Sequence, residues 1–474
     1  MAQNKITFGT GGFRAVIGED FNKDSATKIS QALSDIISQE GLKKKVCVGY
    51  DNRFMSEVFA KWCSEVFAAN GVEVIFLSSS VPTPVVMYVS KKYDLDYSIA
   101  ITASHNPYNY NGVKVFYKSA DASVEVTSEL EKEIESLLNV ESMDFDSAVE
   151  SGLIKQQSYT KDYLESIYSF LNVEKIRKSN IKIVFDAMYG SSIEALQMLI
   201  DDLNISDCEI LNFHRDAFFG FALPAPTPQT TTKLVDTVVN GGYDIGFAVD
   251  GDGDRLAVVD KNGNFIDNNY IMAMLYYYYL KVKGKKGDVV KNICTLNILD
   301  IIAEKYGYNC HQVDVGFKNV SSKMNETGAL IGGESSGGLA MPGHVSGKDS
   351  IFAICLMIDM LCDMGKRVDE VLEEVKHFAD DYNKVMLEKS YKYEESKKQE
   401  ILDVLLVEKK LPTFAKQVKE VIYDRFVKVC FIDGTWTTIR FSGTEPILRI
   451  MAEINEGESE EDVCKPFLDM IGLN

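Results

Sequence analysis

Short apolar runs alternate with longer amphipathic stretches along the first part of this chain. Residues 46–50 and 72–77 are predicted to be buried strands, and the stretches near 56–70 and 85–92 are predicted to be the helices that follow them. A third apolar run, residues 97–101, ends the cycle as another strand. Strands that alternate with helices in this way are typical of parallel sheets that are covered by helices on both faces.

The same alternation recurs twice further along the chain. Strands are predicted at residues 181–185, 208–211, 243–249, 289–293, 311–313 and 329–331. Helices are predicted near residues 192–203, 231–240 and 298–306. A loop of unusual composition follows the last strand of each cycle. We therefore predict an internal repeat of three similar α/β domains with mixed, largely parallel sheets, which direct three different loops at one shared centre.

The end of the chain follows a different pattern. Residues 389–410 are highly charged and are predicted to form a linker and a helix. Residues 427–431 and 436–441 are predicted to be strands on either side of a hairpin turn at Asp433-Gly434. We expect a smaller α+β domain here. The length of 474 residues suits four domains, which we place at 1–150, 151–260, 261–380 and 381–474.

Composition narrows the class of protein. Lys and Arg number 50 against 70 Asp and Glu, so the net charge is −20, which argues against nucleic acid or an anionic membrane as the main partner. The nine cysteines include no CxxC pair and indicate buried free thiols in a reducing compartment. The N-terminus shows no apolar signal region, and no apolar run approaches the ~20 residues of a membrane helix. We expect a cytoplasmic protein, and the sequence predicts no particular oligomeric state.

The loop after residues 97–101 carries the first candidate chemistry. It reads Thr102-Ala103-Ser104-His105-Asn106-Pro107, directly past a strand end, where α/β sheets present groups to ligands. A serine held there beside a histidine can act as a nucleophile or carry a phosphoryl group. Ser, Asn and Pro are also ordinary turn residues, so the prediction depends on the other loops of the chain.

The second loop is acidic and reads Asp250-Gly251-Asp252-Gly253-Asp254-Arg255. The glycines permit a tight loop in which the three carboxylates converge, and clustered carboxylates repel one another unless a hard cation neutralises them. The alternative is a solvated Asp-Gly turn. An EF-hand is excluded because its twelfth position, which requires Glu, is Lys261. Three protein ligands leave coordination positions open for a phosphate oxygen, which favours Mg²⁺.

Three further segments are candidates for ligand contact. Residues 332–338, with one carboxylate and two hydroxyls, suit sugar hydroxyls, although a flexible linker would have a similar composition. Residues 440–446 combine arginine, hydroxyls and a glycine turn, a pattern that suits a phosphate, and the alternative is an ordinary turn. Residues 9–14 form a second glycine-rich loop that ends in Arg14. Lys114 would face the site from a returning strand as a cation or proton acceptor, unless it is a surface lysine.

Taken together, these loops resemble the α-D-phosphohexomutases, the family of phosphoglucomutase and phosphomannomutase. The resemblance rests on Phe8–Arg14 and on the motifs TASHNP, DGDGDR and RFSGTEP in this order, and it spans nearly the whole chain. It implies four domains arranged around a central cleft, an expectation that agrees with the three cycles and the distinct C-terminal part.

The resemblance also implies roles for individual residues. Ser104 resembles the phosphoserine of these enzymes, and Asp250, Asp252 and Asp254 would hold Mg²⁺ together with an oxygen of the Ser104 phosphate. The residues that would surround the transferring phosphoryl group are Arg14, His105, Lys114 and Arg255, with Lys114 as proton shuttle. Those that would contact the substrate are Lys318, Glu334, Ser336, His344, Arg440, Ser442, Gly443, Thr444 and Arg449, of which Glu334 and Ser336 would grip sugar hydroxyls and the last five the non-reacting phosphate.

The implied reaction interconverts a hexose 1-phosphate and a hexose 6-phosphate through the phosphoserine and a bisphosphorylated sugar. The partner is then a small sugar phosphate, and glucose 1,6-bisphosphate is the expected activator. Ser335 stands where phosphoglucomutases often have Glu and glucosamine enzymes tend to have Gln, and Gly338 stands where phosphomannomutases often have His. We therefore expect glucose first and mannose second. The alternatives are a phosphoglucosamine mutase, a Mg²⁺-dependent phosphatase, or a non-catalytic sugar-phosphate binding protein.

Overall fold

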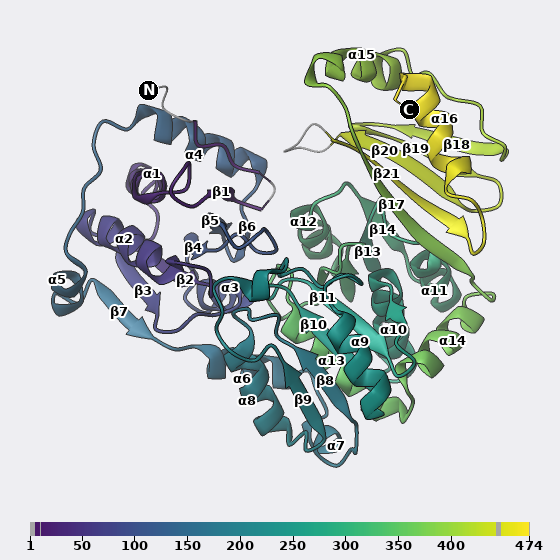
Figure 1. Cartoon of the computed structure of the whole chain (residues 1–474), viewed down its shortest axis with the longest axis horizontal. Helices are drawn as coiled ribbons and strands as arrows, with labels where there is room; N and C mark the ends of the chain where they lie inside the picture. Colours follow the sequence, from purple (N-terminus) through teal and green to yellow (C-terminus); the bar gives the residue numbers. More distant parts are fainter. Residues whose placement is uncertain (1–4, 10, 442–446, 474) are drawn as a thin grey trace. The chain divides into compact units, whose positions relative to one another are not determined.

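The computed structural model describes residues 5–9, 11–441 and 447–473, and the chain divides into two compact units. The first unit extends to Asn292 and resumes at Ala303–Val375, and the second consists of Ile293–Ile302 and Lys376–Asn474. Figure 1 shows the helices and strands of both units. The first unit contains three mixed sheets, and the second contains one antiparallel sheet.

The three sheets of the first unit share one layout. The first has the order β1 (Phe13–Val16), β5 (Tyr110–Tyr117), β4 (Tyr97–Ile101), β2 (Lys45–Tyr50), β3 (Glu73–Leu77) and β7 (Ile154–Gln157), with β6 (Ala120–Asp121) beside β5. The second has the order β12 (Phe265–Ile266), β11 (Leu256–Asp260), β10 (Ile245–Val249), β8 (Ile183–Asp186) and β9 (Cys208–Leu211). The third has the order β14 (Cys310–Val313), β13 (Val289–Asn292), β15 (Ile331–Gly333) and β16 (Leu339–Ala340).

The predicted internal repeat is confirmed by this topology. In each sheet three consecutive strands pair in parallel, and the third of them lies beside the first. An antiparallel strand then returns along the third strand, as β5 does on β4, β11 on β10 and β16 on β15. The candidate loops at residues 102–107, 250–255 and 332–338 each connect such a third strand to its returning strand. The three loops therefore occupy the same topological position in three copies of one pattern.

The helices follow the expected alternation. They are α1 (Lys23–Gln39), α2 (Ser56–Ala69), α3 (Thr83–Lys92), α4 (Val124–Ser136), α5 (Phe145–Glu150), α6 (Thr160–Tyr168), α7 (Val173–Arg177), α8 (Ile193–Leu203), α9 (Thr232–Gly241), α10 (Asn268–Lys281), α11 (Ile298–Tyr306), α12 (Phe317–Thr327), α13 (Ser350–Met364), α14 (Val368–Phe378), α15 (Lys398–Leu402) and α16 (Glu461–Ile471). Residues 270–280 of α10 are all buried, and α13 is buried from Ser350 to Leu361. The tyrosine-rich run 275–280 is thus part of a packed helix, as its composition predicts.

The sheet of the second unit has the order β17 (Lys384–Lys392), β21 (Ile447–Asn455), β20 (Trp436–Phe441), β19 (Phe426–Phe431) and β18 (Val418–Tyr423). The predicted hairpin turn is present, because Gly434 has a left-handed φ of 77° and Asp433 accepts the Thr435 N–H. The prediction of a linker at residue 389 was wrong, since β17 continues to Lys392. This edge strand alternates exposed and half-buried residues, so its sequence resembles a charged linker.

The sheets also extend past the predicted domain limits. β7 pairs in parallel with β3 beyond residue 150, and β12 pairs with β11 beyond residue 260. Residues 293–302 group with the C-terminal unit and not with the strands on either side of them in the sequence. These pairings join segments that are separated in the chain, and the local pattern of apolar residues does not carry that information.

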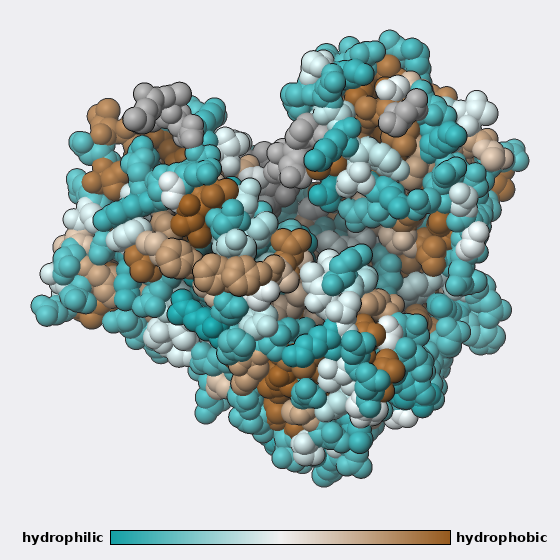
Figure 2. All heavy atoms as spheres, in the orientation of Figure 1, coloured by the Kyte–Doolittle hydropathy of each residue, from teal (hydrophilic) through white to brown (hydrophobic). Residues whose placement is uncertain are grey.

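The hydrophilic surface and the cysteine thiols are as the amino-acid composition predicts. On the face seen in Figure 2, hydrophilic residues predominate and apolar residues appear in separate groups. The nine cysteines, all among the described residues, form no disulfide, and five of them are buried, namely Cys47, Cys63, Cys294, Cys355 and Cys464. Within the described part of the chain, every helix falls short of the length and apolar character that crossing a bilayer requires.

A buried carboxylate explains why residues 293–302 belong to the second unit. Glu453 in β21 is completely buried. Its Oε2 accepts the backbone N–H of Asn297 at 2.8 Å and the indole N–H of Trp436 at 2.8 Å, and its Oε1 accepts the hydroxyl of Tyr382 at 2.7 Å. The ammonium of Lys384 lies 3.4 Å from the same Oε1. Glu453 therefore connects the inserted segment to the sheet.

Replacing Glu453 by Ala is expected to destabilise the second unit by about 3 kcal/mol, because the buried donors and the ammonium lose their acceptor. The measurement is urea unfolding followed by the fluorescence of Trp436 in a Trp62→Phe background. Glu456→Ala, which removes an exposed charge nearby, is the matched control and should leave the transition in place. Equal midpoints for the two variants would contradict this role for Glu453.

Candidate active site

The candidate loops of the first unit lie at the ends of β4, β10 and β15 and form one polar network. The Ser104 hydroxyl donates to Asp250 Oδ2 at 2.9 Å, which joins the first loop to the second. The ammonium of Lys348 lies 3.2 Å from Glu334 Oε1 and contributes to lowering the pKa of Asp254, which relates the third loop to the second. The structure thus brings together the side chains that the sequence places after three separate strands.

Ser104 is held in an unusual backbone conformation. Its φ is 52°, in the left-handed region that non-glycine residues seldom adopt, and the residue is 1% exposed. The hydroxyl of Thr102 accepts its backbone N–H at 2.9 Å, and His105 Nδ1 lies 3.3 Å from its Oγ. Such strain persists only where the surroundings fix the conformation, and it is concentrated at functional sites.

Arg53 fixes the Ser104 loop from behind, and sequence reasoning missed it. Its side chain is fully buried, its Nε lies 3.2 Å from Asp51 Oδ2, and burial lowers its pKa while Asp51 raises it. Its two Nη atoms donate to four backbone carbonyls of the loop, those of Ser104 (2.6 Å), Asn106 (2.7 Å), Pro107 (2.8 Å) and Tyr110 (3.1 Å). The available signal was Asp51-Asn52-Arg53, a polar triplet directly after the buried strand β2.

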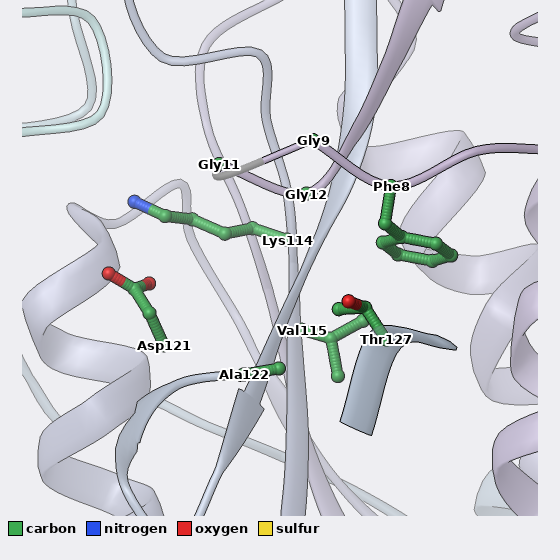
Figure 3. A pocket seen from close by; sticks show the side chains of 9 residues that line it. All are labelled: Phe8, Gly9, Gly11, Gly12, Lys114, Val115, Asp121, Ala122 and Thr127. Carbon is green, nitrogen blue, oxygen red and sulfur yellow. The ribbon is translucent and has the colours of Figure 1, made fainter. Parts of the chain in front are cut away.

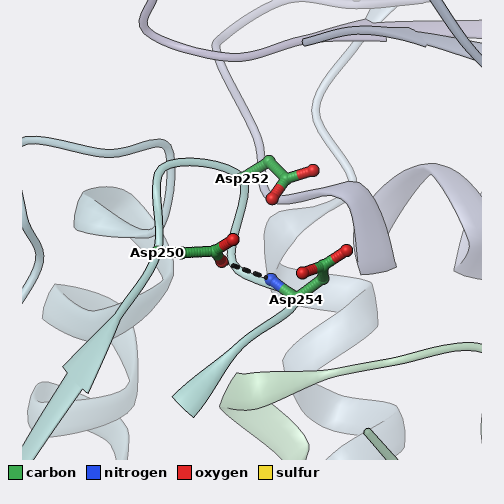
Figure 4. A group of neighbouring side chains, drawn as sticks. All are labelled: Asp250, Asp252 and Asp254. Atoms are coloured by element: carbon green, nitrogen blue, oxygen red, sulfur yellow. Dashed lines mark hydrogen bonds between the residues drawn. The ribbon is translucent and has the colours of Figure 1, made fainter. Parts of the chain in front are cut away.

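The three aspartates converge as predicted (Figure 4). Ligand oxygens of Asp250, Asp252 and Asp254 lie within 4.8 Å of one another, and all three residues are buried. Asp250 Oδ1 accepts the backbone N–H groups of Asp254 at 2.9 Å and Arg255 at 3.0 Å. Burial and the two neighbouring carboxylates hold the pKa of Asp250 well above its usual value. The cluster therefore has an excess of negative charge that a bound cation would relieve.

Two oxygens of this cluster are available to a ligand. Asp252 Oδ1 and Asp254 Oδ1 are buried and have no hydrogen-bond partner among the described residues. Buried polar atoms are nearly always hydrogen-bonded or bound to a metal. These oxygens, with Asp250 beside them, form an oxygen-only donor set that fits a hard divalent cation such as Mg²⁺.

Lys114 is a buried partner of the acidic cluster and not a surface residue. Its Nζ lies 2.7 Å from Asp254 Oδ2 and 3.5 Å from Asp252 Oδ2. Burial by itself lowers the pKa of the ammonium, but the carboxylates of Asp254 and Asp252 outweigh it, and the pKa is raised. Lys114 is therefore charged in this state and donates hydrogen bonds to the two carboxylates. Its role as a proton shuttle during a reaction stays a prediction.

Arg14 and Arg255 place positive charge near the Ser104 loop, and His105 lies beside the Ser104 hydroxyl. Arg14 donates to the carbonyl of Gly11 at 3.0 Å and to Asn106 Oδ1 at 2.9 Å, so it links the glycine-rich loop to the Ser104 loop. Burial, with Arg255 and Arg14 adding to it, lowers the pKa of His105 to about 3, so its imidazole is neutral near pH 7. The Nε of Arg255 is buried with no hydrogen-bond partner in the part of the chain that the structure describes.

A small cavity lies between the glycine-rich loop and Lys114 (Figure 3). Its volume of about 10 Å³ matches a single water molecule. Gly9, Gly11 and Gly12 line one side, and Lys114 and Asp121 line the other. Burial raises the pKa of Asp121, while Lys114 lowers it. Asp121 lies on the short strand β6, and no motif in the sequence indicated it.

The third loop presents Glu334 in a defined orientation. Its Oε1 accepts from Ser336 at 3.1 Å and lies 3.2 Å from the Lys348 ammonium, and its Oε2 accepts from Asn292 at 3.1 Å. Burial alone would raise the pKa of Glu334, but Lys348 and the two hydrogen-bond donors lower it, so the carboxylate is ionised. The sequence analysis assigned no role to Lys348, and the structure adds it to the site.

Lys318 and His344 have protein partners in this structure. Lys318, in the first turn of α12, lies 3.1 Å from Glu125 Oε2. The imidazole of His344 is buried, lies 2.6 Å from Asp349 Oδ2 and stacks on Phe352 with 4.0 Å between the ring centroids. His344 thereby braces the loop that carries Lys348. Contact of either residue with a substrate stays a prediction.

The second unit contains the predicted phosphate-binding arginines. Arg440 in β20 and Arg449 in β21 are directly opposite each other in the antiparallel register. Arg449 Nη1 lies 3.2 Å from Glu388 Oε1, and the Nε of Arg440 is buried without a hydrogen-bond partner among the described residues. Like charges directly opposite each other in a sheet are unfavourable unless an anion lies between them. Ser442, Gly443 and Thr444 lie outside the described residues.

Comparison with known proteins places this site in a family. Four family models match consecutive parts of the chain: phosphoglucomutase/phosphomannomutase alpha/beta/alpha domain I at residues 5–141, domain II at 161–263, domain III at 267–378, and the C-terminal domain at 392–470. A phosphoglucomutase/phosphomannomutase of Thermococcus kodakarensis is 29% identical over 458 residues and 96% of both chains. A probable phosphoglucosamine mutase of Pyrococcus furiosus is 30% identical, over 97% of this chain and 96% of its own.

Solved structures show the same fold. A putative phosphomannomutase from Thermus thermophilus superposes with a TM-score of 0.85 at 23% identity, over 99% of both chains. An N-acetylphosphoglucosamine mutase from Aspergillus fumigatus, solved in complex with GlcNAc-6P and magnesium, gives a TM-score of 0.55 at 13% identity, over 100% of this chain and 96% of its own. The chain belongs to the α-D-phosphohexomutase family. Like the mutases named among its relatives, it is an isomerase of the intramolecular phosphotransferase class.

Arg53→Lys is expected to lower kcat on the order of 100-fold, because one ammonium cannot satisfy four carbonyls and the Ser104 hydroxyl shifts. The KM for the sugar phosphate is expected to change much less. The measurement is steady-state kinetics at saturating Mg²⁺, with circular dichroism to confirm the fold. Arg215→Lys, at an exposed position of the same unit, is the control. A folded Arg53→Lys variant with kcat within twofold of the unaltered protein would contradict this role.

Proposed function

We propose that this protein interconverts the 1-phosphate and 6-phosphate of a hexose, with glucose as the preferred sugar. The observation that carries the proposal is Ser104, which is buried, has a left-handed backbone conformation and donates its hydroxyl to Asp250 in a cluster of three carboxylates. A hydroxyl in that position is placed to accept a phosphoryl group and to pass it on, with cationic side chains nearby to stabilise the charge that develops.

Mg²⁺ is the proposed metal, held by Asp250, Asp252 and Asp254 and by an oxygen of phosphorylated Ser104. The unpartnered oxygens of Asp252 and Asp254 support this assignment. When bound, the ion would neutralise the carboxylates and draw electron density from the phosphoryl group. The remaining positive charge comes from the chain itself, through Lys114 beside the carboxylates and Arg14 and Arg255 near His105.

The reaction is proposed to run in two transfers. The Ser104 phosphoryl group passes to the 6-hydroxyl of a hexose 1-phosphate, which breaks the bond to Ser104 Oγ, and the hydroxyl proton goes to a side chain of the site. The sugar bisphosphate then reorients in the site, and Ser104 Oγ takes the phosphoryl group from position 1. This step breaks the bond between phosphorus and the sugar 1-oxygen, and that oxygen takes the proton back from the site. Lys114 and Asp121 flank a cavity of about one water molecule, which provides a short route for that proton. A lost intermediate leaves Ser104 unphosphorylated, so glucose 1,6-bisphosphate is the proposed activator.

The sugar is proposed to be held by Glu334 and Ser336. Glu334 is ionised and fixed by Lys348, so it can accept hydrogen bonds from neighbouring hydroxyls of the ring. Arg440 and Arg449 are proposed to hold the phosphate that does not react. A second candidate substrate is glucosamine phosphate, because several relatives of similar identity are named phosphoglucosamine mutases. Mannose phosphate remains a further candidate on the basis of the relative from Thermococcus kodakarensis.

A direct assay distinguishes these candidates. Purified protein with Mg²⁺ and a trace of glucose 1,6-bisphosphate is expected to convert glucose 1-phosphate to glucose 6-phosphate faster than it converts the glucosamine or mannose 1-phosphates. Ser104→Ala is expected to abolish conversion of all three sugars, while Ser38→Ala, an exposed serine, should retain it. Release of inorganic phosphate without isomer would indicate a phosphatase, and a higher kcat/KM for glucosamine would reassign the sugar.

Metal binding can be tested without turnover. Mg²⁺ at about 100 times its dissociation constant contributes about 2.7 kcal/mol to the native state that binds it, so thermal unfolding of the first unit is expected to shift upward by a few degrees. EDTA should reverse the shift. Asp252→Asn should lose it, whereas Asp236→Asn, an exposed aspartate of the same unit, should keep it. An identical shift in both variants would refute this metal site.

A further inference from the structure

The backbone of the acidic loop is held by three hydroxyl-bearing residues in a repeated arrangement. The carbonyl oxygens of Gly251, Asp252 and Gly253 each accept two hydrogen bonds, one from the backbone N–H and one from the side-chain hydroxyl of a single Ser or Thr. The donors and their N–H and hydroxyl distances are Ser191 to Gly251 (3.0 and 3.1 Å), Thr83 to Asp252 (2.9 and 3.3 Å) and Ser350 to Gly253 (3.2 and 2.7 Å).

The three donors come from three different domains of the family. Thr83 lies in the segment that matches domain I, Ser191 in domain II and Ser350 in domain III. All three residues are 1–2% exposed. Thr83 and Ser350 are the first residues of α3 and α13, and Ser191 lies two residues before α8. The positive ends of three helices therefore converge on a loop that carries three carboxylates, which lowers the repulsion among them.

The loop has little freedom to move away from these contacts. A Cβ atom at Gly251 would lie 2.8 Å from the carbonyl oxygen of Ser104. A Cβ atom at Gly253 would lie 2.6 Å from both Pro82 Cβ and Ser192 Oγ, and Gly253 has a left-handed φ of 71°. The two glycines thus permit an approach that other residues would prevent. The loop is fixed both by steric contact and by six hydrogen bonds on consecutive carbonyls.

We propose that Thr83, Ser191 and Ser350 are positioning residues that set the spacing of the three carboxylates and so the affinity of the metal site. This inference rests on the proposed metal function of Asp250, Asp252 and Asp254. Each hydroxyl fixes the peptide unit beside a carboxylate-bearing residue, and removal of one bond from a carbonyl lets that unit rotate. Groups that orient metal ligands in this way typically change metal affinity by 10–100-fold when they are removed.

The position of the donors has a consequence for the enzyme as a whole. Each of the three domains donates hydrogen bonds to one carbonyl of the loop. A displacement of any one domain would therefore shift the loop backbone and change the spacing of the carboxylates. The metal loop is then one point at which residues of all three domains meet. This differs from a site built within one domain, where the neighbouring domains would contribute only to the substrate pocket.

The test measures Mn²⁺ binding by electron paramagnetic resonance on the full chain with Ser104 unphosphorylated. Thr83→Val, Ser191→Ala and Ser350→Ala are each expected to weaken Mn²⁺ binding by on the order of 10-fold. Thr83→Ser, which restores the hydroxyl, should bind within twofold of the unaltered protein. In turnover, the Mg²⁺ concentration for half-maximal rate should rise by a similar factor, with little change in the KM for the sugar phosphate.

The control separates positioning from general stability. Ser64→Ala removes a buried hydroxyl that donates to Ala60 within α2, away from the loop, and it is expected to leave Mn²⁺ affinity unchanged whatever its effect on thermal unfolding. If Thr83→Val, Ser191→Ala and Ser350→Ala behave like the control, they lower the unfolding temperature and leave the Mn²⁺ affinity unchanged. That result would refute the positioning role and leave the metal site in place. If the unaltered protein binds no Mn²⁺, the proposed metal site fails and this inference fails with it.

Discussion

Three carboxylates buried within 4.8 Å of one another are the constraint on which this structure depends. Each would be unfavourable alone in a low-dielectric interior, and together they repel. The chain compensates in several ways at once. Lys114 contacts two of the carboxylates, Ser104 donates to the third, and backbone N–H groups of the same loop bind Asp250. The oxygens that remain unpartnered define where a cation fits.

The threefold repeat explains how one site combines several kinds of functional group. Each sheet of the first unit presents its loop at the same topological position, between the third parallel strand and the antiparallel strand that returns beside it. One copy carries Ser104, the proposed nucleophile, one carries the three carboxylates and one carries Glu334. Because the two strands that a loop joins fix where it lies, the sequence of the loop can change without disturbing the sheet. The fourth domain is antiparallel throughout and belongs to a separate compact unit.

The sequence predicted those features that depend on local pattern. The strands 97–101 and 436–441 have the bounds that the structure shows, and the acidic triad converges as its glycines indicate. Residues whose role depends on distant contacts were missed, as Arg53, Asp121 and Lys348 show. Arg53 donates to carbonyls about fifty residues away, which no spacing within Asp51-Asn52-Arg53 reveals. The last residues of β17, from Lys389 to Lys392, were likewise predicted to belong to a linker, because their pairing partners lie more than fifty residues further along the chain.

The proposed reaction changes the charge at this centre, and that change bears on how the metal is held. In the unphosphorylated chain the Ser104 hydroxyl donates a hydrogen bond to Asp250, so the contact is attractive. A phosphorylated Ser104 has no proton to donate and adds about two negative charges at neutral pH. The same contact then becomes repulsive unless a cation lies between the phosphate and the carboxylates. Phosphorylation and metal binding are therefore thermodynamically linked, and each favours the other by the same factor.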